Sequence, residues 1–230
     1  MIARGEPWGE PTDRPADVVV TGADAELADA CRHHPGARIT FEPDGGSDLA
    51  RAVGIRAGAD RSPATSSPAT SSPATYSVEL PIDVLELDDG AVVVNAAVLG
   101  APPRQIRWST LGTGVTVKVD GRVVFDGRAT TVVVANGQFL DGDDVVPRGH
   151  PGDGRVEVQV YALRRGERRA MRRRLADGTH VPHPRITQAT GRVVLVRAPA
   201  RVPLVADGRP RGAPEEVRLE VRPGALTLVL

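Results

Sequence analysis

The sequence predicts an α+β protein that is mostly β, with a short N-terminal α/β fragment and a β-sandwich-like C-terminal domain. Short Val- and Leu-rich runs separated by Asp-Gly, Asn-Gly and Pro-Gly turns fill the C-terminal part, a pattern typical of a sandwich or barrel. Two strand–loop–helix units precede them, and a low-complexity repeat stands between. We therefore expect the fragment in residues 1–60, a linker in residues 61–76 and the β-rich domain in residues 77–230.

The N-terminal fragment shows two strand-to-helix alternations. Ala16 to Val20 and Ala37 to Phe41 are short apolar runs that predict buried strands. Glu26 to His33 predicts a helix, and Asp48 to Ile55 predicts a second helix with Ser47 or Asp48 as its N-cap. This βαβα order implies a parallel sheet.

The segment from Ser62 to Thr75 repeats the unit Ser-Pro-Ala-Thr-Ser. Proline at this density prevents both helix and strand ladder, and the repeat offers nothing large to bury. It predicts an extended, semi-stiff linker.

The C-terminal domain is predicted from its apolar runs, several of which alternate with polar residues. The expected strands are Val84 to Leu87, Ala91 to Val98, Val115 to Val119, Thr130 to Ala135, Val156 to Leu163, Val193 to Val196 and Val217 to Val221. One helix, from about Glu167 to Leu175, interrupts them and is closed by Asp177-Gly178.

The composition excludes several classes of function. The formal net charge is zero and aromatic residues make up 3%, which argues against a nucleic-acid partner. With Cys31 as its one cysteine, the chain can form neither an internal disulfide nor a cysteine-based metal site. No apolar run reaches the ~18 residues of a membrane span, and Met1 to Asp13 lack the apolar core of a signal peptide. We expect a cytoplasmic protein; peripheral membrane contact and an oligomer both stay open.

Two loops are candidate phosphate-binding sites. Pro43 to Asp48 and Thr21 to Asp24 each lie between a strand and a helix, and each contains glycine. Glycines let backbone N–H groups approach a phosphate, and a helix N-terminus favours negative charge. The alternative interpretation is two ordinary strand-to-helix turns.

Several acidic and amide turns are candidates for chemistry. Asp207-Gly208 predicts a hairpin turn, and its carboxylate is also a candidate general base at a sheet edge. Asn136-Gly137 and Asp153-Gly154 carry the same two interpretations. The acidic group of Asp141, Asp143 and Asp144 favours a solvated loop over a cation site, because its spacing does not match an EF-hand loop.

An arginine-rich segment surrounds the predicted C-terminal-domain helix. Its members are Arg164, Arg165, Arg168, Arg169, Arg172, Arg173 and Arg174. Two hypotheses stay open: a solvated basic helix, and a surface that docks on anionic lipid head groups. His180 and His183 follow the helix between prolines, which favours loop histidines over a metal pair.

Taken in order, these motifs resemble the diacylglycerol-kinase-like lipid kinases, a family related to sphingosine kinases and NAD kinases. The run Val18 to Ala25 takes the place of the family's Gly-Gly-Asp-Gly-Thr loop. The run Pro43 to Ile55 takes the place of its Pro-x-Gly-Thr-x-Asn-Asp-x-Ala-Arg segment. Further matches are Val134 to Gln138, Asp153-Gly154, Gly178 to His180, Ala206 to Gly208 and Arg222 to Leu226.

The resemblance implies a truncated, Rossmann-like nucleotide-binding fragment joined to the family's β-rich lipid-kinase domain. It implies ATP and Mg²⁺ as cofactors and a lipid hydroxyl, such as that of diacylglycerol, as phosphoryl acceptor. Gly22, Asp24, Gly45, Gly46 and Asp48 would line the nucleotide side, and Asp207 would be the catalytic base; the metal ligands are unknown.

The chain departs from the family's motifs at positions that matter for phosphoryl transfer. Only Gly22 and Asp24 survive in the first loop, the second loop is one residue short, and Asp-Gly-Glu becomes Asp207-Gly208-Arg209. Two functions therefore stay open. One is an ATP-dependent lipid kinase of doubtful activity, and the other is a non-catalytic, lipid-binding or regulatory pseudokinase.

Overall fold

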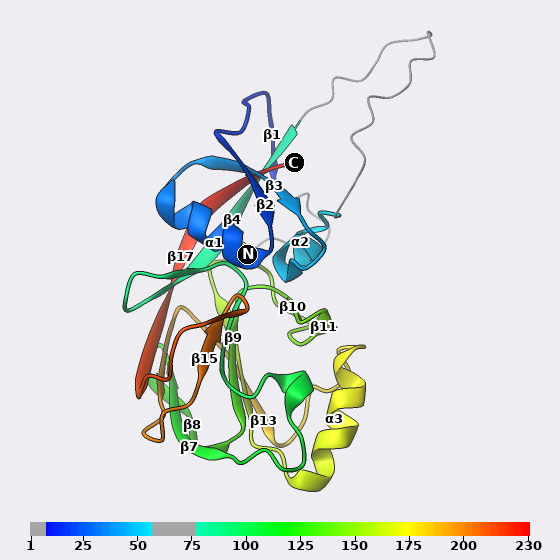
Figure 1. Cartoon of the computed structure of the whole chain (residues 1–230), viewed down its shortest axis with the longest axis vertical. Coiled ribbons are helices and arrows are strands. Elements are labelled where there is room, and N and C mark those ends of the chain that lie inside the picture. Colours follow the sequence, from blue (N-terminus) through cyan, green and yellow to red (C-terminus); the bar gives the residue numbers. More distant parts are fainter. Residues whose placement is uncertain (1–7, 57–76) are drawn as a thin grey trace.

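The computed structural model describes residues 8–56 and 77–230. Figure 1 shows the N-terminal α/β part at one end of the long axis and the β-rich part at the other. Helix α3 flanks the β-rich part. The α+β, mostly β fold that the sequence predicts is confirmed. The predicted linker, Ser62 to Thr75, lies outside the described residues.

One large sheet runs the length of the molecule. In spatial order its main path is β1 (Glu10–Thr12), β4 (Ser77–Leu87), β17 (Glu216–Val229), β14 (Val193–Arg197), β7 (Thr113–Val119) and β8 (Arg122–Ala129). The short strand β5 (Val92–Val93) pairs with β4. All of these pairs are antiparallel.

The N-terminal strands join this same sheet through β17. β2 (Val18–Gly22) and β3 (Arg38–Pro43) are parallel, as the βαβα pattern predicts. β3 also pairs in parallel with the end of β17, where Leu228 lies opposite Ile39. The register of β17 against β4 shifts between Arg222 and Leu226, and beyond this shift the last residues of β17 pair with β4 on one side and with β3 on the other. One continuous sheet therefore connects the predicted fragment and the predicted domain.

A second sheet packs against the large one and closes the sandwich. Its order is β13 (Ile186–Gly191), β12 (Val156–Tyr161), β9 (Thr131–Ala135), β6 (Ala96–Gly100), β15 (Leu204–Ala206) and β16 (Arg209–Pro210). The hairpin of β10 (Phe139–Leu140) and β11 (Asp143–Asp144) stands apart from it. Fully buried valines from both sheets, including Val117, Val134, Val158 and Val194, form the core between them.

The helices cover the outer faces. α1 (Asp24–His33) and α2 (Asp48–Val53) pack on the N-terminal end of the large sheet, where Leu27 and Leu49 are completely buried. α3 (Arg168–Leu175) follows the 3₁₀ turn η2 (Arg165–Glu167) and packs Met171 and Leu175 against the second sheet. A further 3₁₀ turn, η1 (Pro103–Gln105), lies beside it. Among the described residues, no helix is long and apolar enough to cross a membrane.

Several strands fall where the sequence pattern predicts none, and the two longest of them are β8 and β13. β8 is largely exposed and β13 reads Ile-Thr-Gln-Ala-Thr-Gly, so neither shows an apolar run. Each lies at an edge of its sheet, where one flank of the strand has no neighbouring strand to pack against. In the same way, Pro223-Gly224 is typical of a turn but lies inside β17, at its register shift.

Candidate functional site

The start of α2 is capped by residues of its own chain. Ser47 is the N-cap, and its hydroxyl accepts a hydrogen bond from the backbone N–H of Ala50 at 2.9 Å. The carboxylate of Asp24, the first residue of α1, accepts bonds from the N–H of Asp48 at 3.1 Å and of Leu49 at 3.2 Å. It also accepts a short hydrogen bond from the Ser47 hydroxyl. An internal carboxylate therefore occupies the N-terminal N–H groups that would otherwise be available to a phosphate.

Burial changes the acidity of Asp24. The side chain is 6% exposed, and burial raises its pKa to about 6, although the bonds from Ser47 and Leu49 favour the ionised form. The pKa of Asp48 is also raised, by burial first and by the charge of Asp141 second. Two carboxyl groups, those of Asp24 and Asp48, therefore lie in a partly desolvated environment at the start of α2.

The glycines of the two loops have different roles. Gly22 ends β2 with φ of +138°, and its carbonyl accepts the N–H of Asp44 at 3.0 Å, which holds the loops together. A Cβ added at Gly22 would lie 2.8 Å from Cγ of Glu26, so the position also needs glycine for space. Gly45 has φ of +94°, and the N–H of Gly46 donates to the Asp44 side chain at 2.8 Å. The second loop is therefore an Asx turn closed on itself.

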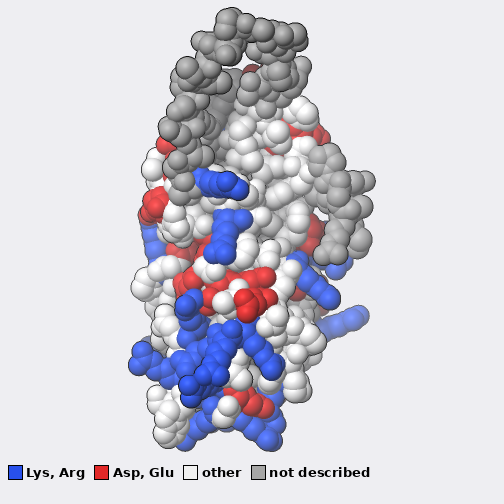
Figure 2. Space-filling model, turned by 90° about the vertical axis from the view of Figure 1, so that its right-hand side faces the viewer, with Lys and Arg blue, Asp and Glu red and all other residues white. Residues whose placement is uncertain are grey.

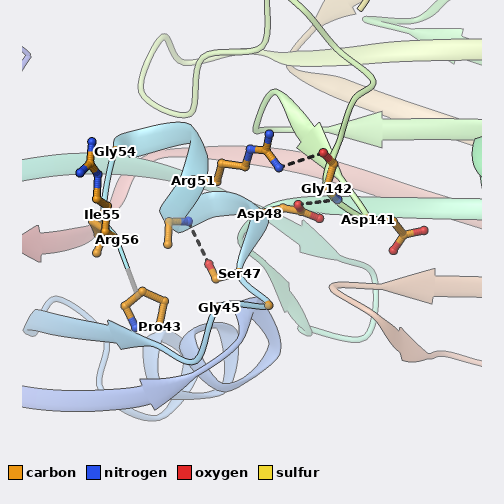
Figure 3. A pocket seen from close by; sticks show the side chains of 12 residues that line it. Pro43, Gly45, Ser47, Asp48, Arg51, Gly54, Ile55, Arg56, Asp141 and Gly142 are labelled. Atoms are coloured by element: carbon orange, nitrogen blue, oxygen red, sulfur yellow. Dashed lines mark hydrogen bonds between the residues drawn. The ribbon is translucent and has the colours of Figure 1, made fainter. Parts of the chain in front are cut away.

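A cavity of about 760 Å³ opens beside α2. Its described lining consists of Pro43, Gly45, Gly46, Ser47, Asp48, Ala50, Arg51, Gly54, Ile55, Arg56, Asp141 and Gly142. Figure 3 shows Asp48 and Arg51 reaching across to Gly142, whose N–H donates to Asp48 and whose carbonyl accepts from Arg51, each at 2.9 Å. The Arg51 guanidinium also lies 4.4 Å from the centre of the Phe139 ring. The volume suits a nucleotide-sized ligand, but Arg51 is already engaged by the β10–β11 hairpin.

Asp207 lies in the hairpin turn that the sequence predicts, between β15 and β16. Its φ of +45° and the φ of +75° at Gly208 are those of a tight hairpin turn. The carboxylate accepts three backbone N–H bonds, from Val94 at 2.7 Å and from Asn95 and Ala96 at 3.0 Å. It thereby fixes the segment that joins β5 to β6.

Asp207 also has a raised pKa. Burial is the main cause, the neighbouring charge of Asp24 is the second, and together they bring the pKa to about 7 despite the three N–H bonds. This value suits a general base, since a base is most effective when its pKa is near the working pH. The charge of Asp24 contributes to the raised pKa of Asp207, so these two predicted site residues interact electrostatically.

Arg209 stands where the resembled family has glutamate, and it is held by α1. Its guanidinium donates to Glu26 at 2.7 Å and makes a short bond to Asp29. Glu26 in turn accepts the N–H of Ala23, at the start of α1, at 2.9 Å. The arginine therefore ties the Asp207 hairpin to the N-terminal fragment, across 180 residues of chain.

Two buried asparagines complete the centre of the molecule. Asn136 donates to the carbonyls of Asp83 at 2.6 Å and Val94 at 2.9 Å, and Asn95 donates to the carbonyl of Phe139 at 3.1 Å. A Cβ at Gly137 would lie 2.3 Å from Oδ1 of Asn95, so Gly137 makes room for that side chain. Asn136-Gly137 is therefore a packing element here, and Asp153-Gly154 likewise supports Asp83 through the N–H of Gly154 at 2.5 Å.

The carboxylates of this centre do not fit a Mg²⁺ ion held by protein ligands. Within residues 8–56 and 77–230, no three His, Cys, Asp or Glu side chains lie together as a metal-binding group. Asp24 and Asp207 already accept backbone N–H bonds, which compete with a metal for the same oxygens.

The structure brings the predicted nucleotide-side residues into one neighbourhood but divides them. Gly45, Gly46 and Asp48 line the cavity, whereas Gly22 and Asp24 lie behind it and hold the two loops together. Arg51 and Gly142 also line the cavity and are not among the predicted site residues; Phe139 packs against the Arg51 guanidinium. Arg51 could have been found from the sequence, because it belongs to the Asp-x-Ala-Arg motif. The β10–β11 hairpin matches no motif that would have indicated it.

Comparison with known proteins agrees with this architecture. The family model described as the YegS C-terminal NAD kinase beta sandwich-like domain matches residues 106–230. The chain belongs to this family. A search of curated proteins gives no match. The match covers the β-rich part that carries Asp207 and α3, and it confirms the resemblance predicted from the order of the motifs.

Solved structures extend the similarity to the N-terminal part. A diacylglycerol kinase from Bacillus anthracis str. Sterne has a TM-score of 0.67 at 17% identity, over 92% of this chain and 75% of that chain. The NADH kinase of yeast, complexed with NADH, has a TM-score of 0.53 at 12% identity, over 94% and 62% of the two chains. An NAD kinase from Archaeoglobus fulgidus, in complex with ATP, has a TM-score of 0.50 at 13% identity, over 94% and 81%. At these identities the likeness establishes the fold.

Proposed function

We propose that this protein is a diacylglycerol-kinase-like pseudokinase: a non-catalytic, lipid-binding or regulatory protein that has kept the fold of a lipid kinase. The observation that carries the proposal is that Ser47, which stands where the resembled family has asparagine, binds the Asp24 carboxylate and with it takes up the first N–H groups of α2. Phosphoryl transfer relies on positioned phosphates, a metal and a base. Here the place for the phosphates is taken by an acid of the chain itself.

Electrostatics strengthens this argument. Above pH 6 the Asp24 carboxyl is ionised, and a phosphate brought to α2 would meet its negative charge as well as that of Asp48. Two unit charges 4 Å apart repel by about 4 kcal/mol at an effective dielectric constant of 20. Arg209 adds a second departure, because a cation paired with Glu26 and Asp29 replaces the carboxylate of the family's motif. ATP binding is therefore expected to be weaker than about 10 μM, or about −6.8 kcal/mol.

One observation favours the second candidate, an active ATP-dependent lipid kinase that uses Mg²⁺. Asp207 has a pKa of about 7, raised by burial and by the charge of Asp24, and such a value suits a general base. In this case Asp207 would accept the proton of the lipid hydroxyl, and the cavity lined by Gly45, Gly46 and Arg56 would hold the nucleotide.

Phosphate transfer from γ-labelled ATP to diacylglycerol in mixed micelles, with Mg²⁺, separates the two candidates. An active diacylglycerol kinase serves as the positive control, and the Asp207→Asn variant serves as the blank. We expect wild-type protein and Asp207→Asn to give the same background. Labelled phosphatidic acid made by the wild type and lost in Asp207→Asn would overturn the proposal and establish the kinase.

A further inference from the structure

The loop of residues 106–112, between η1 and β7, exposes two large apolar side chains. Leu111 is 77% exposed and Trp108 is 67% exposed, the highest values among the large hydrophobic side chains of the described residues. Tryptophan is enriched where proteins meet the membrane interface, since its ring is apolar and its N–H is polar. Two such side chains on one short loop therefore indicate a surface that is covered in use.

Arg168 fixes this loop to α3. Its side chain is buried, and one guanidinium nitrogen, Nη1, donates to the carbonyls of Arg107 at 2.8 Å, Trp108 at 3.0 Å and Thr110 at 2.7 Å. Hydrogen bonds from a charged donor are stronger than those between neutral groups. The apolar loop and the helix therefore form one rigid surface, and Arg168 acts as its internal support instead of facing solvent as the sequence pattern predicted.

The remaining arginines surround the apolar side chains. Arg165 lies 5.0 Å from the Trp108 ring centre, in a cation–π contact. A hollow of about 380 Å³ lies on the same helix and is lined by Arg104, Asp143, Arg169, Arg172, Arg173 and Ala176. The buried Asp143 pairs with Arg104 at 2.7 Å, and no described carboxylate pairs with Arg169 or Arg173. Figure 2 shows the lysine and arginine side chains concentrated on the lower half of this face.

We propose that the α3 surface, formed by residues 104–112 and 164–176, docks on the anionic face of a lipid bilayer. Trp108 and Leu111 enter the head-group layer, while the arginines of α3 and the hollow beside them bind lipid phosphates. Charge complementarity identifies the occupant, because the chain has zero net charge overall and yet gathers its cations here. A nucleic acid fits this surface less well, because the aliphatic side chain of Leu111 would make no favourable contact with it and a single exposed tryptophan is a poor platform for base stacking.

This inference deepens the proposed function by naming the surface that contacts lipid. It rests on the proposed function only in assuming that the ligand is a lipid. Its test contains no ATP. An active kinase would overturn the pseudokinase proposal and leave the docking surface unaffected.

Vesicle sedimentation tests the surface. Wild-type protein is expected to pellet with vesicles of 30% phosphatidylglycerol in phosphatidylcholine, to stay in solution with pure phosphatidylcholine, and to be released at 0.5 M NaCl. Each arginine removed should weaken binding about fivefold. Arg169→Gln/Arg173→Gln should therefore weaken it more than tenfold, and Trp108→Ser/Leu111→Ser should do the same without changing the charge.

The matched control is Arg14→Gln/Arg32→Gln, which removes the same charge from exposed positions in the N-terminal part, at the other end of the molecule. It should bind as the wild type does. A second readout uses the Trp8→Phe variant, in which Trp108 is the one remaining tryptophan and its emission should shift to shorter wavelength on anionic vesicles. Equal binding to neutral and anionic vesicles, equal loss in the control variant, or binding to RNA without binding to vesicles would overturn the proposal.

Discussion

The hydroxyl of Ser47 donates a hydrogen bond to the carboxylate of Asp24, and through it the first helix of the chain caps the second. This contact joins the two loops that resemble phosphate-binding loops. It leaves their polar groups bonded to one another, and it ties the stability of the fragment to the protonation of one buried acid.

The pH dependence of stability follows from that acid. Asp24 has a pKa of about 6 in the folded protein, above the ordinary aspartate value of 3.8, so the folded state binds more protons than the unfolded state between these two pH values. The contribution of Asp24 to the free energy of unfolding is therefore largest below pH 4 and is lost as the pH rises through 6. The loss is on the order of 2–3 kcal/mol.

Urea unfolding at pH steps from 4 to 8 measures this. In Asp24→Asn the decrease in the free energy of unfolding between pH 4 and 6 should be smaller than in the wild type. Because Asp24 also raises the pKa of Asp207, the decrease between pH 6 and 7 should be smaller as well. Identical pH profiles for the variant and the wild type would show that Asp24 is not the responsible group.

Nucleotide affinity should respond to the same charge. At pH 8, Asp24→Asn removes one negative charge from the start of α2 and should tighten ATP binding about thirtyfold, since a unit charge at ~8 Å contributes about 2 kcal/mol at an effective dielectric constant of 20. At pH 5 the difference should vanish, because Asp24 is then protonated in the wild type. Titration calorimetry measures both, with Glu10→Gln as a control for net charge. The same gain in Glu10→Gln would rule out a local effect.

Three substitutions at Asp207 distinguish its role in the turn from its role as a hydrogen-bond acceptor. Asp207→Asn keeps an acceptor and tolerates positive φ, so it should be the mildest. Asp207→Gly keeps the turn but leaves the N–H groups of Val94, Asn95 and Ala96 without the carboxylate, which should cost about 2–3 kcal/mol. Asp207→Ala should cost about 1 kcal/mol more through backbone strain. Denaturant midpoints give the order, and Gly more stable than Asn would contradict the role assigned to the carboxylate.

Arg168 and Arg173 are five positions apart in one arginine-rich segment and should behave oppositely. Arg168→Gln removes the donor to three loop carbonyls and should lower the free energy of unfolding by about 2 kcal/mol. Arg173→Gln changes an exposed side chain and should cost less than 0.5 kcal/mol. Thermal unfolding compares them, and equal effects would mean that Arg168 does not support the loop.

The bridge from Arg209 to α1 should depend on salt. Arg209→Ala breaks half-exposed pairs with Glu26 and Asp29, so we expect a loss of about 0.5–1 kcal/mol at low salt. The loss should nearly disappear in 1 M NaCl, where charges are screened within about 3 Å. A loss that persists in high salt would show that packing of the arginine stem, instead of charge, joins the two parts.

The sequence predicts the local elements well where a physical signal is local. Ser47 opens α2 and Asp207-Gly208 turns a hairpin, because capping and turn formation depend on the residues themselves and their immediate neighbours. The parallel β2–β3 pair follows for the same reason, since strand and helix alternate over a short stretch.

What the sequence does not predict is which polar side chains are already used. Asp24 matches the family's motif, and its engagement by Ser47 and Leu49 appears only when residues 23 to 25 positions apart meet. Arg168 looks like Arg169 in the sequence, yet one is buried and the other exposed, because the loop of residues 106–112 lies over one side of the helix. Long-range contacts of this kind decide whether a motif residue faces a ligand or supports the fold.

The position of β17 has a consequence for how the protein is made. The hydroxyl of Thr40 in β3 donates to the carbonyl of Val229, 189 residues later, and the parallel pairing of these strands depends on the same stretch. A ribosome therefore releases the N-terminal strands long before their partner exists, and contacts of such sequence separation form slowly. Until β17 has been synthesised, the edge of β3 in the nascent N-terminal part is unpaired and accessible to proteases and chaperones.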